Sequence, residues 1–117
     1  MLLVDDEPAN VRALSRRLHR HEVLAADGFE EAAKILQGTP VDVVVSDNMM
    51  LGPEAGVALL RLARTLQPRA WRFMYSANPP ARLGQLKVEG VIHRFFPKPS
   101  DAPLVRALER RRLQEAC

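Results

Sequence analysis

Five polar residues in the sequence could together carry phosphoryl-transfer chemistry, because each directly follows or ends an apolar run. Asp5 and Asp6 follow the first run, Asp47 follows VVVS, Ser76 ends the segment MYS, and Lys98 follows FFP. Three carboxylates brought close together repel one another, so they need a cation between them. Oxygen ligands favour a hard ion, and we expect Mg²⁺ or another divalent cation such as Mn²⁺.

The residue types also assign a role to each group. A carboxylate oxygen is a competent nucleophile, so Asp47 could accept a phosphoryl group and form an aspartyl phosphate. The charge of Lys98 and the hydroxyl of Ser76 would then stabilise the phosphoryl oxygens, since this chemistry depends mainly on positioning and charge. Because the Ser76 bond can form only after the group has arrived, Ser76 could also sense it.

Each of these residues alone has a simpler structural interpretation. The acidic pair before Pro8 could cap a helix, and Asp47 could cap the turn after its strand. Ser76 could be an ordinary turn residue, and Lys98 could be a surface charge. Four such coincidences at four strand ends are much less expected than one shared site, and we therefore favour the site.

The segments around these residues predict the elements that position them. Short apolar runs without alternation are typical of strands buried on both faces of a parallel sheet, and the longer amphipathic segments between them predict helices. The predicted strands cover residues 2–4, 22–26, 41–45, 71–75 and 91–96, and the predicted helices cover 8–20, 29–36, 56–66, 81–88 and 101–114. This alternation predicts an α/β fold with a single doubly wound five-stranded parallel sheet and five helices, whose ligands bind at the carboxyl ends of the strands.

Composition excludes several other classes of protein. The 117 residues fit one domain, which we assign to residues 1–117 with no output domain, and the single cysteine, Cys117, makes no internal disulfide. The net charge of +3 is spread over helix faces, so we expect no nucleic-acid binding. No apolar run approaches the roughly 20 residues of a membrane span. With no signal peptide at the start, we expect a cytoplasmic location and no membrane partner.

The same motifs resemble the receiver domain of bacterial response regulators, the CheY-like family, over the whole chain. LLVDDEPANVRALSRRL is similar to the family's first strand, acidic pair and first helix, and VVVSDNMM is similar to its third strand with the phosphoacceptor. YSA and RFFPKP resemble the ends of its fourth and fifth strands.

The resemblance implies a strand order of 2-1-3-4-5 and a role for each residue. Asp47 would be the phosphoacceptor, with Ser76 and Lys98 binding the phosphoryl oxygens. Phe95 would be the switching aromatic residue, and the Lys98–Pro99 bond would be cis. The metal ligands would be Asp5, Asp6, Asp47 and the backbone carbonyl of Met49.

The resemblance also implies partners and a mechanism. The donor would be a sensor histidine kinase or phosphotransfer protein, and the switch would act on a downstream target protein, a fused output domain, or a second copy through the fourth-helix to fifth-helix face. The domain would be a signalling switch rather than an enzyme. Leu51 replaces the usual proline and the run 51–56 is one residue longer than usual, so a degenerate receiver that binds proteins without phosphorylation is the alternative. A haloacid dehalogenase-type phosphatase fits less well, because its two aspartates lie one residue apart.

Overall fold

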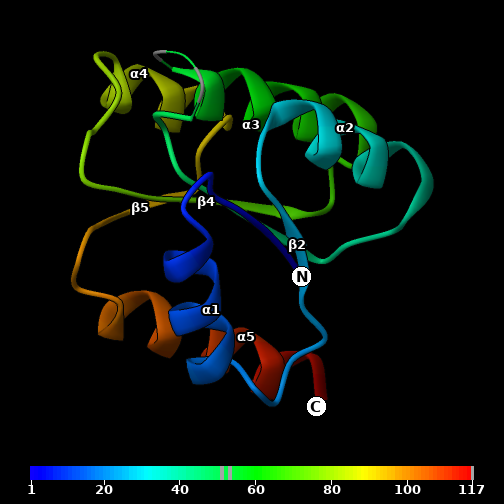
Figure 1. Cartoon of the computed structure of the whole chain (residues 1–117). Helices are drawn as coiled ribbons and strands as arrows, with labels where there is room; N and C mark the ends of the chain where they lie inside the picture. The colour runs from blue at the N-terminus through cyan, green and yellow to red at the C-terminus, as the bar shows by residue number, and fades with distance from the viewer. Residues whose placement is uncertain (51, 53, 117) are drawn as a thin grey trace.

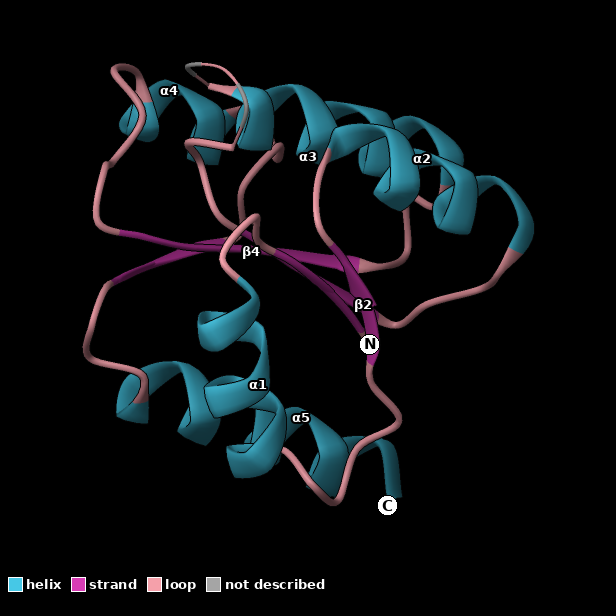
Figure 2. Ribbon diagram, viewed as in Figure 1, coloured by secondary structure: helices cyan, strands magenta, loops and turns pink. Residues whose placement is uncertain are grey.

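The chain forms a five-stranded parallel sheet between two layers of helices (Figures 1 and 2). The computed structural model describes residues 1–50, 52 and 54–116, with side chains described through residue 110. The strands are β1 (Leu2–Val4), β2 (Leu24–Ala26), β3 (Val43–Ser46), β4 (Trp71–Ser76) and β5 (Arg94–Pro97). The helices are α1 (Pro8–Arg17), α2 (Phe29–Gly38), α3 (Ala55–Leu66), α4 (Leu83–Val88) and α5 (Ala102–Ala116). The strand order is β2-β1-β3-β4-β5, which confirms the predicted topology.

The pairing register aligns the carboxyl ends of β1 and β3, and β4 extends two residues further. Val4 on β1 pairs with Ser46 on β3, and Ser46 pairs with Met74 on β4. The next residue along β1 and β3 is therefore an aspartate in each case, at one edge of the sheet. Right-handed crossovers between parallel strands place all the carboxyl ends on the same side of the sheet, where ligands bind in folds of this kind.

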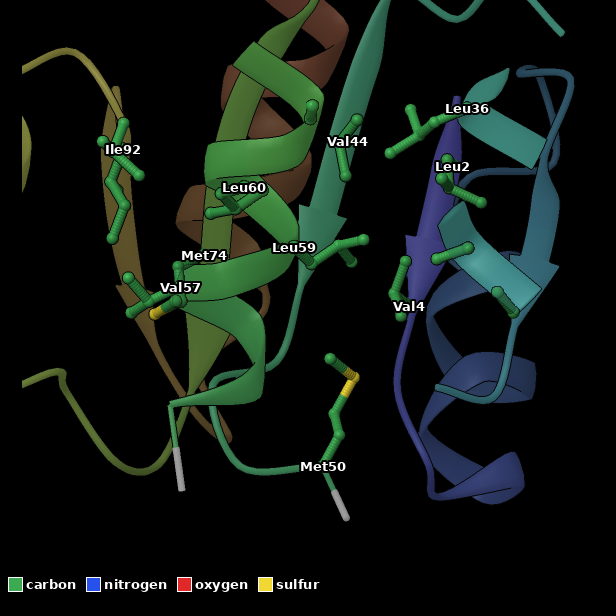
Figure 3. Close-up of a cluster of buried hydrophobic side chains, with 14 of the residues drawn as sticks. Leu2, Val4, Leu36, Val44, Met50, Val57, Leu59, Leu60, Met74 and Ile92 are labelled. Carbon is green, nitrogen blue, oxygen red and sulfur yellow. The ribbon is translucent and has the colours of Figure 1, made fainter. Parts of the chain in front are cut away.

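Successive side chains alternate between the two faces of the sheet and build two separate cores. Figure 3 shows the core beneath α2, α3 and α4, which includes Leu2, Val4, Val44 and Met74. The other core lies beneath α1 and α5, as the two layers of helices in Figure 2 make clear. It contains Leu3, Leu14, Val45, Phe73, Phe96, Leu104 and Leu108, among others.

Several predicted boundaries were wrong, and the reasons are physical. The first helix ends at Arg17 instead of residue 20, because the Leu18 N–H bonds the carbonyls of Leu14 and Ser15 as the chain turns. The last strand begins at Arg94 instead of residue 91. Val91 and Ile92 are fully buried, yet their N–H groups bond the carbonyl of Leu86 at the end of α4 instead of joining the sheet ladder. An apolar run thus indicates that its residues are buried. Whether the run is a strand depends on its backbone hydrogen bonds to a neighbouring strand.

The edge strand β2 is shorter than predicted, beginning at Leu24 instead of residue 22. Two of its three residues are exposed, as expected where only one neighbouring strand is present. Among the described residues, no helix combines the length and the apolar character needed to cross a membrane.

Candidate functional site

Three carboxylates meet at the carboxyl ends of β1 and β3. Asp5, Asp6 and Asp47 each offer an oxygen, and these oxygens all lie within 4.8 Å of one another. Asp5 and Asp47 are nearly enclosed, each with 11% of its side chain exposed, whereas Asp6 is exposed. Alternation places Asp5 and Asp47 on the α1 and α5 side of the sheet.

Lys98 supplies the positive charge within this cluster. Its ammonium group donates to Oδ2 of Asp5 at 2.6 Å and to Oδ2 of Asp47 at 2.9 Å. Burial lowers the pKa of Lys98, but the hydrogen bonds and charges of the two aspartates outweigh burial and hold the pKa above its ordinary value. The lysine is therefore a fixed cation joining the ends of β1, β3 and β5. The Lys98–Pro99 bond is cis, as predicted.

The remaining oxygens of the two buried carboxylates accept hydrogen bonds from the backbone. Oδ1 of Asp47 accepts the N–H of Asn48 at 2.7 Å, and Oδ1 of Asp5 accepts the N–H of Glu7 at 2.9 Å. The N-cap residue of α1 is Glu7, so neither aspartate occupies the capping position that the simpler interpretation gave to the pair. Asp5 instead organises the turn before the helix while it holds Lys98.

This donor set fits a hard divalent cation. Three carboxylates supply oxygen ligands within a few ångströms of one another, and Asp6 leaves one side of the cluster open to water, which Mg²⁺ retains when bound. Met49 lies two residues after Asp47 and is 47% exposed, and its carbonyl remains a predicted ligand. Among the described side chains, Lys98 is the cation that pairs with Asp5 and Asp47.

The predicted sensor residue, Ser76, ends β4 and is followed by a tethered loop. Ser76 is fully buried at the end of β4, and its Oγ accepts the N–H of Asn78 at 3.1 Å. The buried side chain of Asn48 donates to the carbonyl of Asn78 at 3.0 Å, and its own Oδ1 has no hydrogen-bond partner among the described residues. Asn48 therefore links the loop after β3, next to Asp47, to the loop that follows Ser76.

A second contact joins the same two loops. Oε1 of Glu54 accepts the N–H of Ala81 at 3.3 Å. Phe95, the predicted switching residue, is partly buried and packs against the core beneath α4. Neither the Asn48 contact nor the Glu54 contact could be predicted from the sequence, because an asparagine or a glutamate in a loop carries no pattern that indicates its partner in space.

Gly56 permits the backbone of α3 to approach the site. Its N–H donates to the carbonyl of Asn48 at 2.9 Å. A Cβ at this position would overlap the carbonyl oxygen of Asp47 and would lie 2.8 Å from the Cα of Asn48. The backbone of Asp47 is therefore set by the absence of a side chain on Gly56. Of the departures from the family pattern, Leu51 lies outside the described residues, as does residue 53 of the longer run 51–56.

Replacing Lys98 by methionine is expected to destabilise the protein when no divalent ion is present, because two nearly enclosed carboxylates lose their cation. We expect a loss of roughly 1–2 kcal/mol, given partial access to solvent. Mg²⁺ should bind the variant more tightly, since it no longer competes with the lysine. Urea unfolding with and without Mg²⁺, together with calorimetric titration, measures both effects; equal stability and equal affinity would contradict this account.

The lysine also gives stability a defined dependence on pH. The pKa of Lys98 is raised in the folded protein, so its contribution is complete below the ordinary lysine value of 10.5 and is lost as the pH rises through the folded value. The parent protein should thus lose more stability above pH 10.5 than the Lys98→Met variant does. Parallel losses in the two proteins would show that Lys98 is not the group responsible.

Comparisons with known proteins agree with this geometry. The sequence profile described as "Response regulator receiver domain" matches residues 1–109 of the chain. No curated protein matches the chain by sequence. Among solved structures, adenylate cyclase from Rhodopirellula baltica is similar, with 29% identity, a TM-score of 0.80, and coverage of 92% of this chain and 81% of that one.

Two further structures share the fold at lower identity. A response regulator receiver domain protein (CheY-like) from Methanospirillum hungatei JF-1 has 19% identity and a TM-score of 0.84, covering 97% of this chain and 92% of that one. The response regulator protein TrrA from Thermotoga maritima, in complex with Mg²⁺–BeF, has 22% identity and a TM-score of 0.80, covering 93% and 95%. At these identities the similarity supports the shared fold alone.

Proposed function

Because the chain belongs to the response regulator receiver domain family and is a receiver of two-component signalling, we propose that it accepts a phosphoryl group on Asp47 and switches a protein-binding surface in response. The observation that carries the proposal is the pair of hydrogen bonds from Lys98 to Asp5 and Asp47 within the three-carboxylate cluster. It supports the proposal because a candidate nucleophile, a cation and oxygen atoms that could hold a divalent ion lie together at the carboxyl ends of the strands. Intact mass after incubation with Mg²⁺ and acetyl phosphate tests it, and a phosphate-sized gain is expected.

Transfer to Asp47 is a displacement at phosphorus. An oxygen of the Asp47 carboxylate attacks the phosphorus of a phosphohistidine, the new P–O bond forms, and the P–N bond breaks with its electron pair leaving on the imidazole nitrogen. Lys98 already contacts Oδ2 of Asp47, so its ammonium needs to move only a short way to bind a phosphoryl oxygen. Asp5 keeps the lysine in place during this exchange, because it shares the same ammonium.

A bound divalent ion would supply charge neutralisation for the phosphoryl oxygens, and Asp5, Asp6, Asp47 and the Met49 carbonyl would hold it. The Mg²⁺–BeF complex of the Thermotoga maritima protein supports this part of the proposal. Receiver domains are signalling switches. The lifetime of the aspartyl phosphate would depend on how easily water reaches the phosphorus past the enclosed carboxylates and Lys98.

The switch would begin at Ser76. Its hydroxyl accepts a hydrogen bond from Asn78 in the resting structure and would turn to donate to a phosphoryl oxygen. The loop after β4 would move with it and strain its tethers to Asn48 and Glu54. Phe95 pairs with Met74 on β4 and packs against the core beneath α4. It would move inward, which changes the surface formed by α4 and β5.

Replacing Ser76 by alanine is expected to uncouple phosphorylation from this movement. Asp47 and Lys98 remain in place, so the variant should still gain phosphate, at a rate roughly tenfold lower through loss of one hydrogen bond in the transition state. Hydrogen exchange at residues 77–82 should change on phosphorylation in the parent and stay constant in the variant. The same exchange response in both proteins would remove Ser76 from the switch.

The partners follow from the same proposal. The phosphodonor would be a sensor histidine kinase or phosphotransfer protein, and the output would be a downstream target protein, a fused output domain, or a second copy meeting the α4 to α5 face. A parent protein that is folded but gains no phosphate, beside a control receiver that does, would favour the alternative of a receiver that binds proteins without phosphorylation.

A further inference from the structure

The ring of Tyr75 lies close to the ammonium group of Lys98. Tyr75 precedes Ser76 on β4, and alternation places its side chain with Phe73 on the α1 and α5 side of the sheet. The Lys98 ammonium lies 5.6 Å from the centre of the Tyr75 ring. The Tyr75 hydroxyl donates to the carbonyl of Pro99 at 3.1 Å, so the ring is fixed to the residue that follows the lysine.

The ring contributes an attraction that the carboxylates do not. An ammonium group is attracted to the electron-rich face of an aromatic ring within about 6 Å, most strongly where water is largely excluded. The Lys98 side chain is only 14% exposed, so this attraction is little weakened by solvent. The ammonium is therefore held by its hydrogen bonds to Asp5 and Asp47 and also by the ring of Tyr75.

A small cavity shows what would happen without the ring. A space of about 20 Å³ lies beneath the cluster, and its wall includes Asp5, Asp47, Val11 and Tyr75. Tyr75 bounds this space together with the two carboxylates that hold the ammonium, so a shorter side chain would enlarge the space next to them. The ammonium would then have room to leave the line between the two carboxylates.

We propose that Tyr75 is a positioning residue that holds the Lys98 ammonium against Asp5 and Asp47 through its ring face and its hydroxyl bond to Pro99. This inference rests on the proposed function and names a residue that affects the rate of phosphoryl transfer to Asp47. Tyr75 touches no reacting atom and acts only through Lys98.

Loss of the Tyr75 ring should raise the affinity for Mg²⁺ and lower the rate of phosphoryl transfer. A loosely held lysine competes less for the carboxylates, so Mg²⁺ binds more tightly. The same loose lysine is less often in place to meet the incoming phosphoryl oxygen, so transfer to Asp47 becomes slower. General disorder of the site would instead weaken metal binding and slow transfer together, and the two explanations are therefore separable.

The test compares Tyr75→Leu with Tyr75→Phe. The leucine variant should bind Mg²⁺ about threefold more tightly by calorimetry and gain phosphate from acetyl phosphate about fivefold more slowly. The phenylalanine variant keeps the ring and should stay within about twofold of the parent in both. Phe73→Leu, which removes a ring from the same face of β4 one layer deeper, is the matched control and should not tighten Mg²⁺ binding.

A Lys98→Met background separates this inference from the proposed function. With no ammonium for the ring to hold, Tyr75→Leu should leave the Mg²⁺ affinity of Lys98→Met unchanged, and this arm needs no phosphorylation. Tighter binding in the parent background only would support the positioning role even if Asp47 takes no phosphate. Weaker Mg²⁺ binding in Tyr75→Leu, no change in it, or an equal change in both backgrounds would overturn it.

Discussion

Replacing Asp47 by asparagine is expected to abolish the phosphate-sized mass gain that the parent shows with Mg²⁺ and acetyl phosphate. Asparagine keeps an oxygen that can accept the Asn48 N–H, so the loop after β3 should persist. It lacks the carboxylate nucleophile, and no other described carboxylate contacts Lys98 except Asp5. Complete loss of the gain, with the circular dichroism spectrum of the parent retained, is the expected result.

Asp42→Asn is the matched control for this experiment. Asp42 directly precedes β3 at its opposite end, with half of its side chain exposed, so the same chemical change occurs far from the cluster. This variant should gain phosphate as the parent does, and neither protein should gain it without Mg²⁺. A phosphate-sized gain in Asp47→Asn would place the acceptor elsewhere and contradict the proposed function.

Replacing Gly56 by alanine is expected to have the largest effect on stability. The new methyl group would overlap the Asp47 carbonyl and lie 2.8 Å from the Cα of Asn48, and both atoms belong to backbone that cannot rotate away. Either α3 or the strand end must shift, which we expect to cost roughly 3 kcal/mol or more. Urea unfolding measures this cost, and the shift should also slow phosphate gain because it displaces the acceptor.

Gly84→Ala serves as the control for a glycine within a helix. Gly84 lies in α4, and a Cβ there would meet no atom within 4 Å. This substitution should stabilise the protein by about 0.5–1 kcal/mol, since alanine favours the helix. If Gly56→Ala were as stable as Gly84→Ala, the close approach of α3 to Asp47 would not exist in solution.

The fold and the acidic cluster could be predicted because both depend on patterns local in the sequence. The apolar runs end at the residues that parallel pairing then aligns, so Asp5 and Asp47 meet as a consequence of the strand order. The boundaries were less predictable. Val91 and Ile92 have the composition of a strand, but their backbone groups close the turn after α4.

Contacts between loops and across strands could not be predicted from local patterns. The hydrogen bond from Asn48 to Asn78 joins residues 30 apart, and no periodicity marks either residue. Tyr75 has the composition of an ordinary strand residue, and its relation to Lys98 depends on the register of β4 against β5. Gly56 resembles any glycine near the start of a helix until the backbone of Asp47 is placed against it.

The bonds from Lys98 to Asp5 and Asp47 also bear on how the chain is made. They span 93 and 51 residues, so the acidic residues leave the ribosome well before their counter-charge. At ordinary rates of translation the interval between Asp47 and Lys98 is about 3 to 10 seconds. During that time Lys98 is not yet available to the two aspartates, and cations from the surrounding solution can take its place. We therefore expect the nascent amino-terminal half to respond more strongly to salt than the finished domain, which gains Lys98 directly after its fifth strand.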